Sequence, residues 1–220
     1  MARPRTPAGR ARLALRRLGE EYPGSAKELC ALVHDNPFQL LAATILSAQT
    51  TDERVNQVTP VLFAVYPSAH ELAVADPQEI EKIIFSTGFY RQKTTSLIGM
   101  ASALVEHHGG QVPTSMKDLT ALPGVGRKTA NVVRGVAFGL PGLPVDTHVG
   151  RLCRRLGLTK ETDPVKVEHE VGAMIPARDR GRFSLILILH GRAVCISRRP
   201  RCDICILADI CPSAFGVSGT

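Results

Sequence analysis

The sequence lacks a long apolar run, which excludes a membrane-spanning helix. Its most apolar stretch, residues 183–189, is interrupted by Ser184 and ends before His190, whereas a span needs 18 or more apolar residues. The first nineteen residues hold six arginines but no apolar core, so they do not form a secretory signal, and an organelle transit peptide is the alternative. We therefore expect no membrane partner and a cytoplasmic location.

Cysteine is scarce until the end of the chain. Cys30 and Cys153 stand alone in apolar helical contexts, and we interpret them as core residues. The other four crowd into seventeen residues with the pattern C-x6-C-x2-C-x5-C, at Cys195, Cys202, Cys205 and Cys211. This crowding argues against a disulfide framework and for a metal site. Four thiolates hold zinc or an iron–sulfur cluster, and the wide first gap favours the larger inorganic core.

The composition predicts a folded protein with a polyanionic partner. The 220 residues are 44% apolar and 21% charged, which is sufficient for a packed core. The 27 Lys and Arg exceed the 20 Asp and Glu, which gives a net charge of +7. Such a basic balance suits nucleic acid.

The sequence also lacks the alternation typical of β-strands, and its apolar residues recur at helical spacing. Asp76-Pro77, Asp163-Pro164 and Asp146-Thr147 each have the form of a helix start. We therefore predict an all-α protein of many short helices. Glycine and proline crowd at residues 139–144, the candidate crossing between two lobes. The pattern alone does not assign the N-terminal helix to either lobe.

Residues 119–130, LTALPGVGRKTA, combine a tight turn with the start of a helix. Gly124 and Gly126 can take positive φ and expose backbone N–H groups next to Arg127, so the turn is a candidate phosphate site. It is not a P-loop, which needs Lys at the position of Arg127, nor a dinucleotide fingerprint, which needs Gly at Thr129. The alternative is an ordinary helix connection.

Two residues, one directly after this turn and one farther along the chain, are candidates for chemistry. Lys128 lies in the first turn of the predicted helix, where the dipole and the adjacent cation disfavour a charged amine, and partial desolvation would make it a nucleophile. The alternative is a solvated lysine on a phosphate. Asp146 follows eighteen residues later and serves as a helix cap, or as a group that shuttles protons and stabilises positive charge. In the cysteine segment, Arg198, Arg199 and Arg201 are candidates for DNA backbone contacts.

Several segments together resemble the bacterial endonuclease III family. They are SAQTTD at 47–52, LPGVGRKTA at 122–130, PVDTH at 144–148, LHGR at 189–192 and the cysteine pattern, within a match over about residues 12–212. The resemblance implies a two-lobe helix-hairpin-helix glycosylase fold, with the hairpin at about 117–139. It implies a six-helix lobe at 30–140, a [4Fe–4S] lobe from 12–29 plus 141–220, and a basic, disordered arm at 1–11.

The resemblance further implies a monomeric bacterial enzyme, in the cytoplasm and on the nucleoid, that binds double-stranded DNA. It would remove oxidised pyrimidines and cleave abasic sites by β-elimination. Lys128 would attack C1′ of the flipped nucleotide and form a Schiff base, with Asp146 supporting charge and proton transfer. Gln49 would fill the gap left by the base, and His148 would lie near the DNA backbone. Further DNA contacts are expected at Leu122, Gly124, Val125, Gly126 and Arg127.

The chain departs from the family at two places. At residues 88–90 the family commonly has a leucine that wedges into the opposite strand, and this chain has Phe89. A phenylalanine can still intercalate, while a core aromatic is the alternative. The second departure is the arginine-rich segment 3–17, which we interpret as a source of nonspecific DNA affinity.

Four other functions remain as alternatives. An adenine-mismatch glycosylase lacks the lysine at the position of Lys128 and usually has a further C-terminal domain, whereas nine residues follow the last cysteine here. A pyrimidine-dimer glycosylase would share the lysine chemistry. A DNA-binding module without catalysis would not nick DNA, and a zinc-binding structural protein would lack absorbance near ~400 nm, where iron–sulfur proteins absorb.

Overall fold

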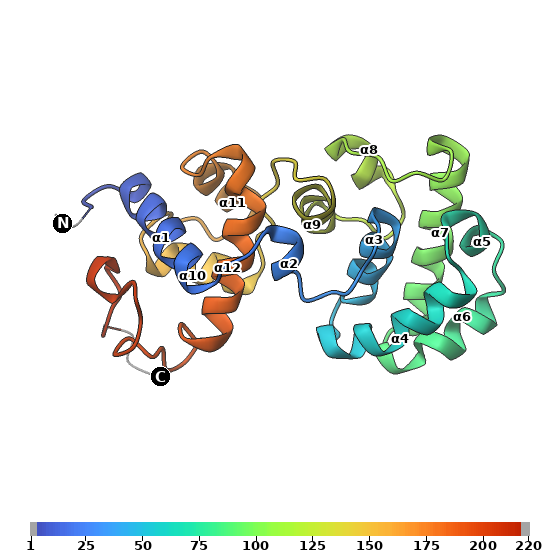
Figure 1. Ribbon diagram of the computed structural model, residues 1–220, viewed down its shortest axis with the longest axis horizontal. Helices are drawn as coiled ribbons and strands as arrows, with labels where there is room; N and C mark the ends of the chain where they lie inside the picture. The colour runs from blue at the N-terminus through green and yellow to red at the C-terminus, as the bar shows by residue number, and fades with distance from the viewer. Residues whose placement is uncertain (1–3, 217–220) are drawn as a thin grey trace. The chain divides into compact units, whose positions relative to one another are not determined.

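The protein is a set of helices in two compact units. The computed structural model describes residues 4–216, and over these residues it contains α- and 3₁₀-helices and no β-strand (Figure 1). The predicted all-α fold is confirmed. By their contacts, residues 30–138 form one unit, here the central unit, and residues 1–29 with 139–220 form the other, here the terminal unit.

The central unit is built around a helix that is buried on most of its surface. Seven of the ten residues of α3 are buried, and it contacts α4, α7 and α9. A helix with apolar residues all round is stable only inside such a cage. The helices of this unit are α3 (Pro37–Leu46), α4 (Asp52–Val65), α5 (Ala69–Ala73), α6 (Pro77–Ile84), the 3₁₀-helix η1 (Phe85–Thr87), α7 (Tyr90–His108), α8 (Met116–Ala121) and α9 (Arg127–Ala137).

The terminal unit is built from both ends of the chain around α12. This helix contacts α1, α2 and α10, and it buries Phe183, Ile186 and Leu187. The helices of this unit are α1 (Pro7–Glu21), α2 (Ala26–Leu29), α10 (Thr147–Arg155), α11 (Pro164–Gly172), the 3₁₀-helix η2 (Ala177–Asp179), α12 (Arg180–Ala193) and the 3₁₀-helix η3 (Ala208–Ile210). Cys153 is fully buried here, as predicted, whereas Cys30 of the central unit is only partly buried.

The three helix starts expected from the sequence are confirmed. Asp76 accepts a hydrogen bond from the Gln78 N–H at 2.9 Å, and Asp163 accepts from the N–H groups of the first turn of α11. Asp146 caps α10 in the same way. Each carboxylate satisfies N–H groups that have no partner within the helix. No described helix is both long and apolar enough to cross a membrane.

The N-terminal segment differs from the expected disordered arm. Residues 1–3 lie outside the described residues, but α1 begins at Pro7, and Thr6 caps it by accepting from the Gly9 N–H at 3.1 Å. The helix is ordered because Ala11, Ala14 and Leu18 are buried in the core of the terminal unit. A cap, a proline in the first turn and an apolar stripe together outweigh the charge repulsion that suggested disorder.

Two arginines of this segment make contacts inside the protein, so the interpretation of the whole segment as a DNA-affinity arm is wrong for them. Arg10 donates to the carbonyl oxygens of Leu156 at 2.7 Å and Gly157 at 2.6 Å, at the end of α10. Arg17 pairs with Asp209 at 2.5 Å and donates to the Ile206 carbonyl at 2.9 Å. These guanidinium groups join distant parts of the terminal unit.

Replacing Arg10 with alanine is expected to destabilise the protein by about 1–3 kcal/mol, because two part-buried carbonyl groups lose their donor. Thermal unfolding followed by circular dichroism measures this loss. Arg12→Ala is the matched control, since Arg12 is exposed and donates within its own helix, to the Ala8 carbonyl at 3.4 Å. Equal melting temperatures for the two variants would contradict the assignment.

Candidate functional site

The hairpin between α8 and α9 is anchored by two apolar side chains. Leu122 and Val125 are only 4% and 5% exposed, and the Val125 N–H donates to the Leu122 carbonyl at 3.1 Å. Gly124 lies between them with φ +75°, and a Cβ there would be 2.7 Å from the Cβ of Ser96. The two apolar side chains therefore face the core, and only their main-chain groups remain available to a ligand.

Gly126 differs from the sequence expectation of positive φ. Its φ is −86°, and a Cβ added there would have no heavy atom within 4 Å. The backbone conformation thus does not require glycine. Gly126 is the N-cap of α9 and offers no side chain to accept from the first-turn N–H groups, and no acidic residue lies in that turn. The positive end of α9 is therefore open to an anion.

Lys128 and Asp146 each occupy the beginning of a helix. Lys128 is the second residue of α9, and its side chain is exposed, so the free protein does not supply the desolvation that would activate its amine. Asp146 is the N-cap of α10 in the terminal unit, and its Oδ1 accepts from the Val149 N–H at 2.8 Å. This cap fixes the carboxylate on its helix and leaves the second oxygen outside that bond.

Gln49 and Phe89 share an unusual backbone conformation. Both are in the left-handed region, with φ 54° and 49°, and both side chains are exposed, Phe89 to 67%. In the central unit they are the non-glycine residues with positive φ. Phe89 is thus not a core aromatic. Left-handed backbone at non-glycine residues costs about 1–3 kcal/mol, and such residues are enriched at functional sites.

His148 is held in a defined orientation by its neighbours. The Arg151 guanidinium contacts His148 Nδ1 at 3.1 Å and donates to the Gly191 carbonyl at 2.9 Å. Because arginine only donates, Nδ1 is the acceptor, and in the neutral ring the proton resides on Nε2. Gly191 is needed for this packing, since a Cβ there would be 3.1 Å from the ring. His148 therefore presents an N–H donor.

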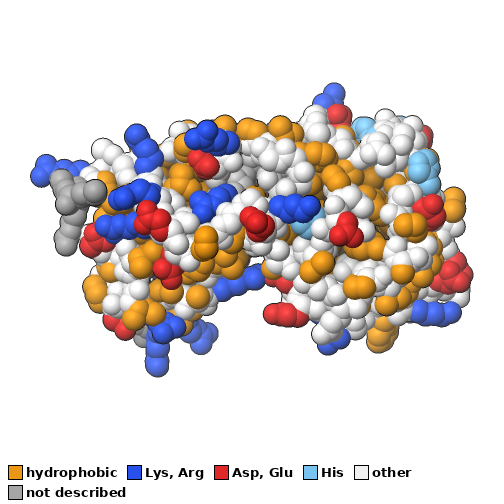
Figure 2. Space-filling model, viewed as in Figure 1, with side chains coloured by type: hydrophobic (Ala, Val, Ile, Leu, Met, Phe, Trp, Pro, Cys, Tyr) orange, Lys and Arg blue, Asp and Glu red, His pale blue; other side chains and the backbone are white. Residues whose placement is uncertain are grey.

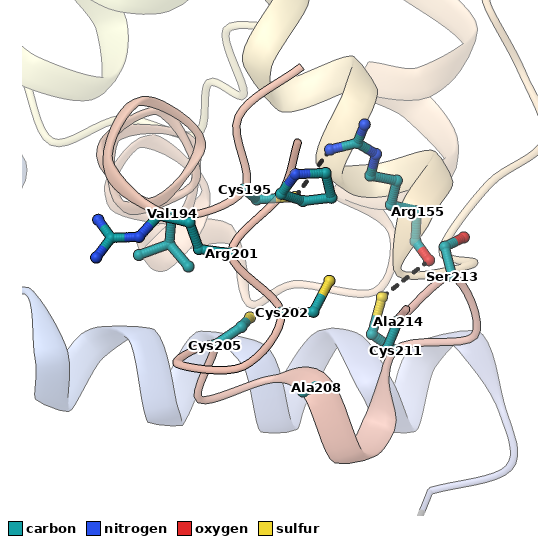
Figure 3. A pocket seen from close by; sticks show the side chains of 11 residues that line it. Arg155, Val194, Cys195, Arg201, Cys202, Cys205, Ala208, Cys211, Ser213 and Ala214 are labelled. Carbon is teal, nitrogen blue, oxygen red and sulfur yellow. Dashed lines mark hydrogen bonds between the residues drawn. The ribbon is translucent and has the colours of Figure 1, made fainter. Parts of the chain in front are cut away.

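The four clustered cysteines line a single pocket in the terminal unit (Figure 3). Among the described residues, no group of three or more His, Cys, Asp or Glu side chains is placed to hold a single metal ion. The thiols surround a shared space instead, with Cys202 between Cys205 and Cys211 in the view of Figure 3. Burial raises the pKa of the Cys205 and Cys211 thiols, so binding of iron must displace their protons. This arrangement fits a polynuclear cluster.

Hydrogen-bond donors point at the sulfur atoms. His190 Nε2 lies 3.3 Å from Cys205 Sγ, and Tyr22 Oη lies 3.3 Å from His190 Nδ1. Burial lowers the pKa of His190 to about 4, so the ring is neutral at pH 7. A Tyr22 hydroxyl that donates to Nδ1 places the ring proton on Nε2, toward the sulfur. The pocket thus offers a neutral donor to a thiolate.

The loop with the predicted DNA-binding arginines is fixed at one end by Arg155. This guanidinium lies 3.3 Å from Cys195 Sγ and donates to the carbonyls of Ile196 at 2.8 Å and Ser197 at 2.6 Å. The next residues, Arg198, Arg199 and Arg201, are exposed. Rigid presentation of exposed guanidinium groups suits a phosphate backbone.

The basic surplus of the chain belongs to the terminal unit. This unit holds 19 of the 27 Lys and Arg and 11 of the 20 Asp and Glu, a net charge of +8, whereas the central unit has 8 and 9, a net charge of −1. Figure 2 shows Lys and Arg side chains on the face of the terminal unit around α1. Electrostatic attraction of a polyanion therefore resides mainly in the terminal unit.

Sequence reasoning missed the residues that orient this site. Arg151, Arg155 and Tyr22 act through hydrogen bonds to partners 40 to 168 positions away in the chain. Of the network residues only His190 carried a signal, because it lies in the LHGR segment. Lys93 of α7 was also missed, although it is buried and bonded to the loops of Gln49 and Phe89.

Comparison with known proteins places this geometry in a family. Residues 42–177 match the HhH-GPD superfamily base excision DNA repair protein, and residues 195–211 match the iron-sulfur binding domain of endonuclease III. The chain is 55% identical to endonuclease III of Synechocystis sp. over 194 residues, which cover 88% of this chain and 87% of that protein.

Solved structures agree with the sequence matches. The structure of a non-covalent endonuclease III–DNA complex matches with a TM-score of 0.86 and 38% sequence identity. The match covers 94% of this chain and 96% of the endonuclease III chain in that complex. A trapped endonuclease III–DNA covalent intermediate, with an estranged adenine, gives the same values.

Alanine substitutions at the two hairpin glycines are expected to have different effects. Gly124→Ala lowers the melting temperature, because the Cβ meets Ser96 and the backbone is left-handed. Gly126→Ala folds normally but occupies the open space above the first-turn N–H groups of α9, so its affinity for an abasic duplex falls about tenfold. Thermal unfolding and fluorescence anisotropy with labelled duplex separate the two effects. Unchanged affinity in a folded Gly126→Ala protein would contradict the anion site.

Proposed function

The chain belongs to the endonuclease III family, and from this membership we propose that Lys128 is its nucleophile and oxidised pyrimidines are its substrates. As a family member it is a bifunctional base excision repair enzyme, a DNA glycosylase with AP lyase activity. It carries a [4Fe–4S] cluster and binds DNA. The observation that carries the proposal is the exposed amine of Lys128 at the open N-terminus of α9.

In the proposed reaction, the Lys128 amine attacks C1′ of a nucleotide turned out of the duplex. The bond between C1′ and the base breaks, and the base leaves with a proton. The Nζ lone pair then expels the ring oxygen from C1′, which opens the sugar and forms the Schiff base. Loss of a C2′ proton and departure of the 3′ phosphate break the C3′–O bond by β-elimination, and hydrolysis of the remaining imine frees the lysine. Since Lys128 is exposed in the free protein, its desolvation is supplied by the bound DNA.

Asp146 is proposed to stabilise the positive charge that develops on the sugar and to move protons. The cap to Val149 holds the carboxylate in one orientation and leaves one oxygen for this task. A fixed carboxylate stabilises a cationic transition state better than a mobile one, because no reorganisation is needed during the reaction.

In the hairpin, where the apolar side chains are buried, the proposed DNA contacts are made by main-chain groups. The N–H groups of Gly124, Gly126 and Arg127 hold a phosphate, and Leu122 and Val125 contribute only their main chain. Gln49 fills the space left by the extruded nucleotide, and Phe89 wedges into the opposite strand. His148 donates Nε2–H to the backbone, and the exposed Arg198, Arg199 and Arg201 bind phosphates.

The remaining assignments complete the proposal. Cys195, Cys202, Cys205 and Cys211, which line one pocket, are the ligands of the cluster. The enzyme acts as a monomer on double-stranded DNA with damaged pyrimidines or abasic sites, in the bacterial cytoplasm at the nucleoid. Oxidised pyrimidines are the substrate class that the endonuclease III resemblance implies.

Borohydride trapping tests the nucleophile. Wild-type protein is expected to form a covalent adduct with a duplex carrying one thymine glycol and none with undamaged duplex. Lys128→Ala loses both the adduct and strand cleavage but still binds. Lys128→Arg is the matched control, because it keeps a cation at α9 yet cannot form a Schiff base. Cleavage by Lys128→Arg would reduce Lys128 to a phosphate contact.

Salt dependence tests the electrostatic part of binding. If basic residues neutralise about six phosphates, a plot of log K against log salt has a slope near −5. Arg198→Ala is expected to make the slope less steep by about one, because one phosphate contact is lost. Binding measured by anisotropy over a range of salt concentrations gives the slope, and a value near zero would exclude this mode of DNA binding.

A further inference from the structure

Lys93 of α7 is a buried cation with two neutral hydrogen-bond acceptors. Lys93 is only 5% exposed. Nζ donates to Thr50 Oγ1 at 2.7 Å and to the Thr87 carbonyl at 2.9 Å. The Thr50 hydroxyl in turn donates to the same Thr87 carbonyl. The ammonium, the hydroxyl and the carbonyl thus form a closed triangle of hydrogen bonds.

This arrangement is costly for the fold. Burial lowers the pKa of Lys93, which means that the protein environment disfavours the charged form. A hydroxyl and a carbonyl oxygen compensate an ammonium less well than a carboxylate does. The stability that Lys93 contributes is therefore reduced at neutral pH and recovers only as the pH rises toward the unfolded pKa near 10.5. A lysine kept only for stability would be a poor choice here.

The triangle joins two particular loops. Thr50 directly follows Gln49 in the loop between α3 and α4. Thr87 is the last residue of η1, two residues before Phe89, which lies in the loop between η1 and α7. Gln49 and Phe89 have left-handed backbone, and Gly88 between Thr87 and Phe89 has φ +67°. Strained conformations of this kind persist only where the surroundings hold them. Lys93 connects the anchors of both strained positions.

We propose that Lys93 is a positioning residue, which clamps the Gln49 and Phe89 loops together so that both side chains enter the duplex as one unit. This inference rests on the proposed function, because it takes Gln49 as the residue that fills the gap of the extruded nucleotide and Phe89 as the wedge into the opposite strand. Without the clamp, each loop must be ordered separately when DNA binds, and base extrusion becomes slower.

The clamp predicts unequal effects on the two activities. A thymine glycol must be turned out of the stack before Lys128 can attack, whereas a preformed abasic site has no base to extrude. Lys93→Met keeps the aliphatic length and removes the ammonium. It is expected to lower single-turnover base excision by about tenfold or more while changing cleavage of an abasic duplex by less than about threefold. Lys82→Met, at an exposed position of α6, is the control for the loss of one charge in this unit.

A spectroscopic readout follows the wedge directly. The chain has no tryptophan, so Phe89→Trp introduces a single indole fluorophore. Its emission should be quenched when the indole stacks in abasic duplex, and the reporter protein is used once its affinity for that duplex matches the wild type. Adding Lys93→Met should reduce the quenching amplitude or rate, whereas adding Lys82→Met should not.

A pair of threonine variants covers the possibility that Lys93→Met fails to fold. Thr50→Val removes the hydroxyl of the triangle and should reproduce the selective loss of base excision. Thr50→Ser keeps the hydroxyl and should retain normal base excision. A general packing role would instead make the two variants alike or lower both activities together.

The outcomes separate the two proposals. Equal base excision by folded Lys93→Met and Lys82→Met overturns the clamp, as does an equal loss of both activities. If wild type forms no borohydride adduct on either duplex, the proposed nucleophile fails. The clamp is then still decided by the tryptophan quenching, where unchanged amplitude and rate in the Lys93→Met protein overturn it.

Discussion

Arginine side chains that donate to main-chain carbonyl oxygens hold the terminal unit together. A guanidinium offers five N–H donors in a rigid plane and can therefore satisfy two or three carbonyl groups at once. The unit uses this property wherever a helix end or an irregular loop meets a distant segment. The arginines concerned are Arg10, Arg17, Arg151, Arg155 and Arg182. The cysteine-bearing segment 195–211 contacts three of them, Arg17, Arg151 and Arg155, so part of the basic surplus also has an architectural role.

The central unit has a different basis. Its core is apolar, its net charge is close to zero, and its functional features lie where regular structure stops. Helices α7 and α9 have no side-chain cap, and Phe89 and Gly126 are their N-cap residues. Most long helices of the chain begin instead with Ser, Thr, Asn or Asp. The two starts give up the stability that a side-chain cap supplies, and they present the backbone N–H groups of α9 and the exposed Phe89 side chain.

The sequence predicted helix starts and the cysteine site well because these depend on short-range chemistry. Asp76-Pro77 and the cysteine spacing are readable within a few residues, and so is the hairpin at Gly124. The conformation of Gly126 could not be predicted from the sequence, because glycine permits both signs of φ and the neighbouring helix selects one. Lys93 was hidden because nothing local distinguishes a buried lysine from a solvated one on a helix. Arg10 was misread, since composition gives charge but not the carbonyl that the charge meets.

The division of the chain into units sets an order for its maturation. The central unit is continuous, at residues 30–138, and its contacts can form as soon as those residues leave the ribosome. The terminal unit can fold only when residues 139–220 have joined residues 1–29, and the cysteines at 195–211 are synthesised after α12. Helix α1 therefore spends the time of synthesis without the α12 face that buries Leu18. All four cysteines are therefore present only after α12 has been synthesised, so insertion of the cluster has to follow the synthesis of the whole central unit and of α12.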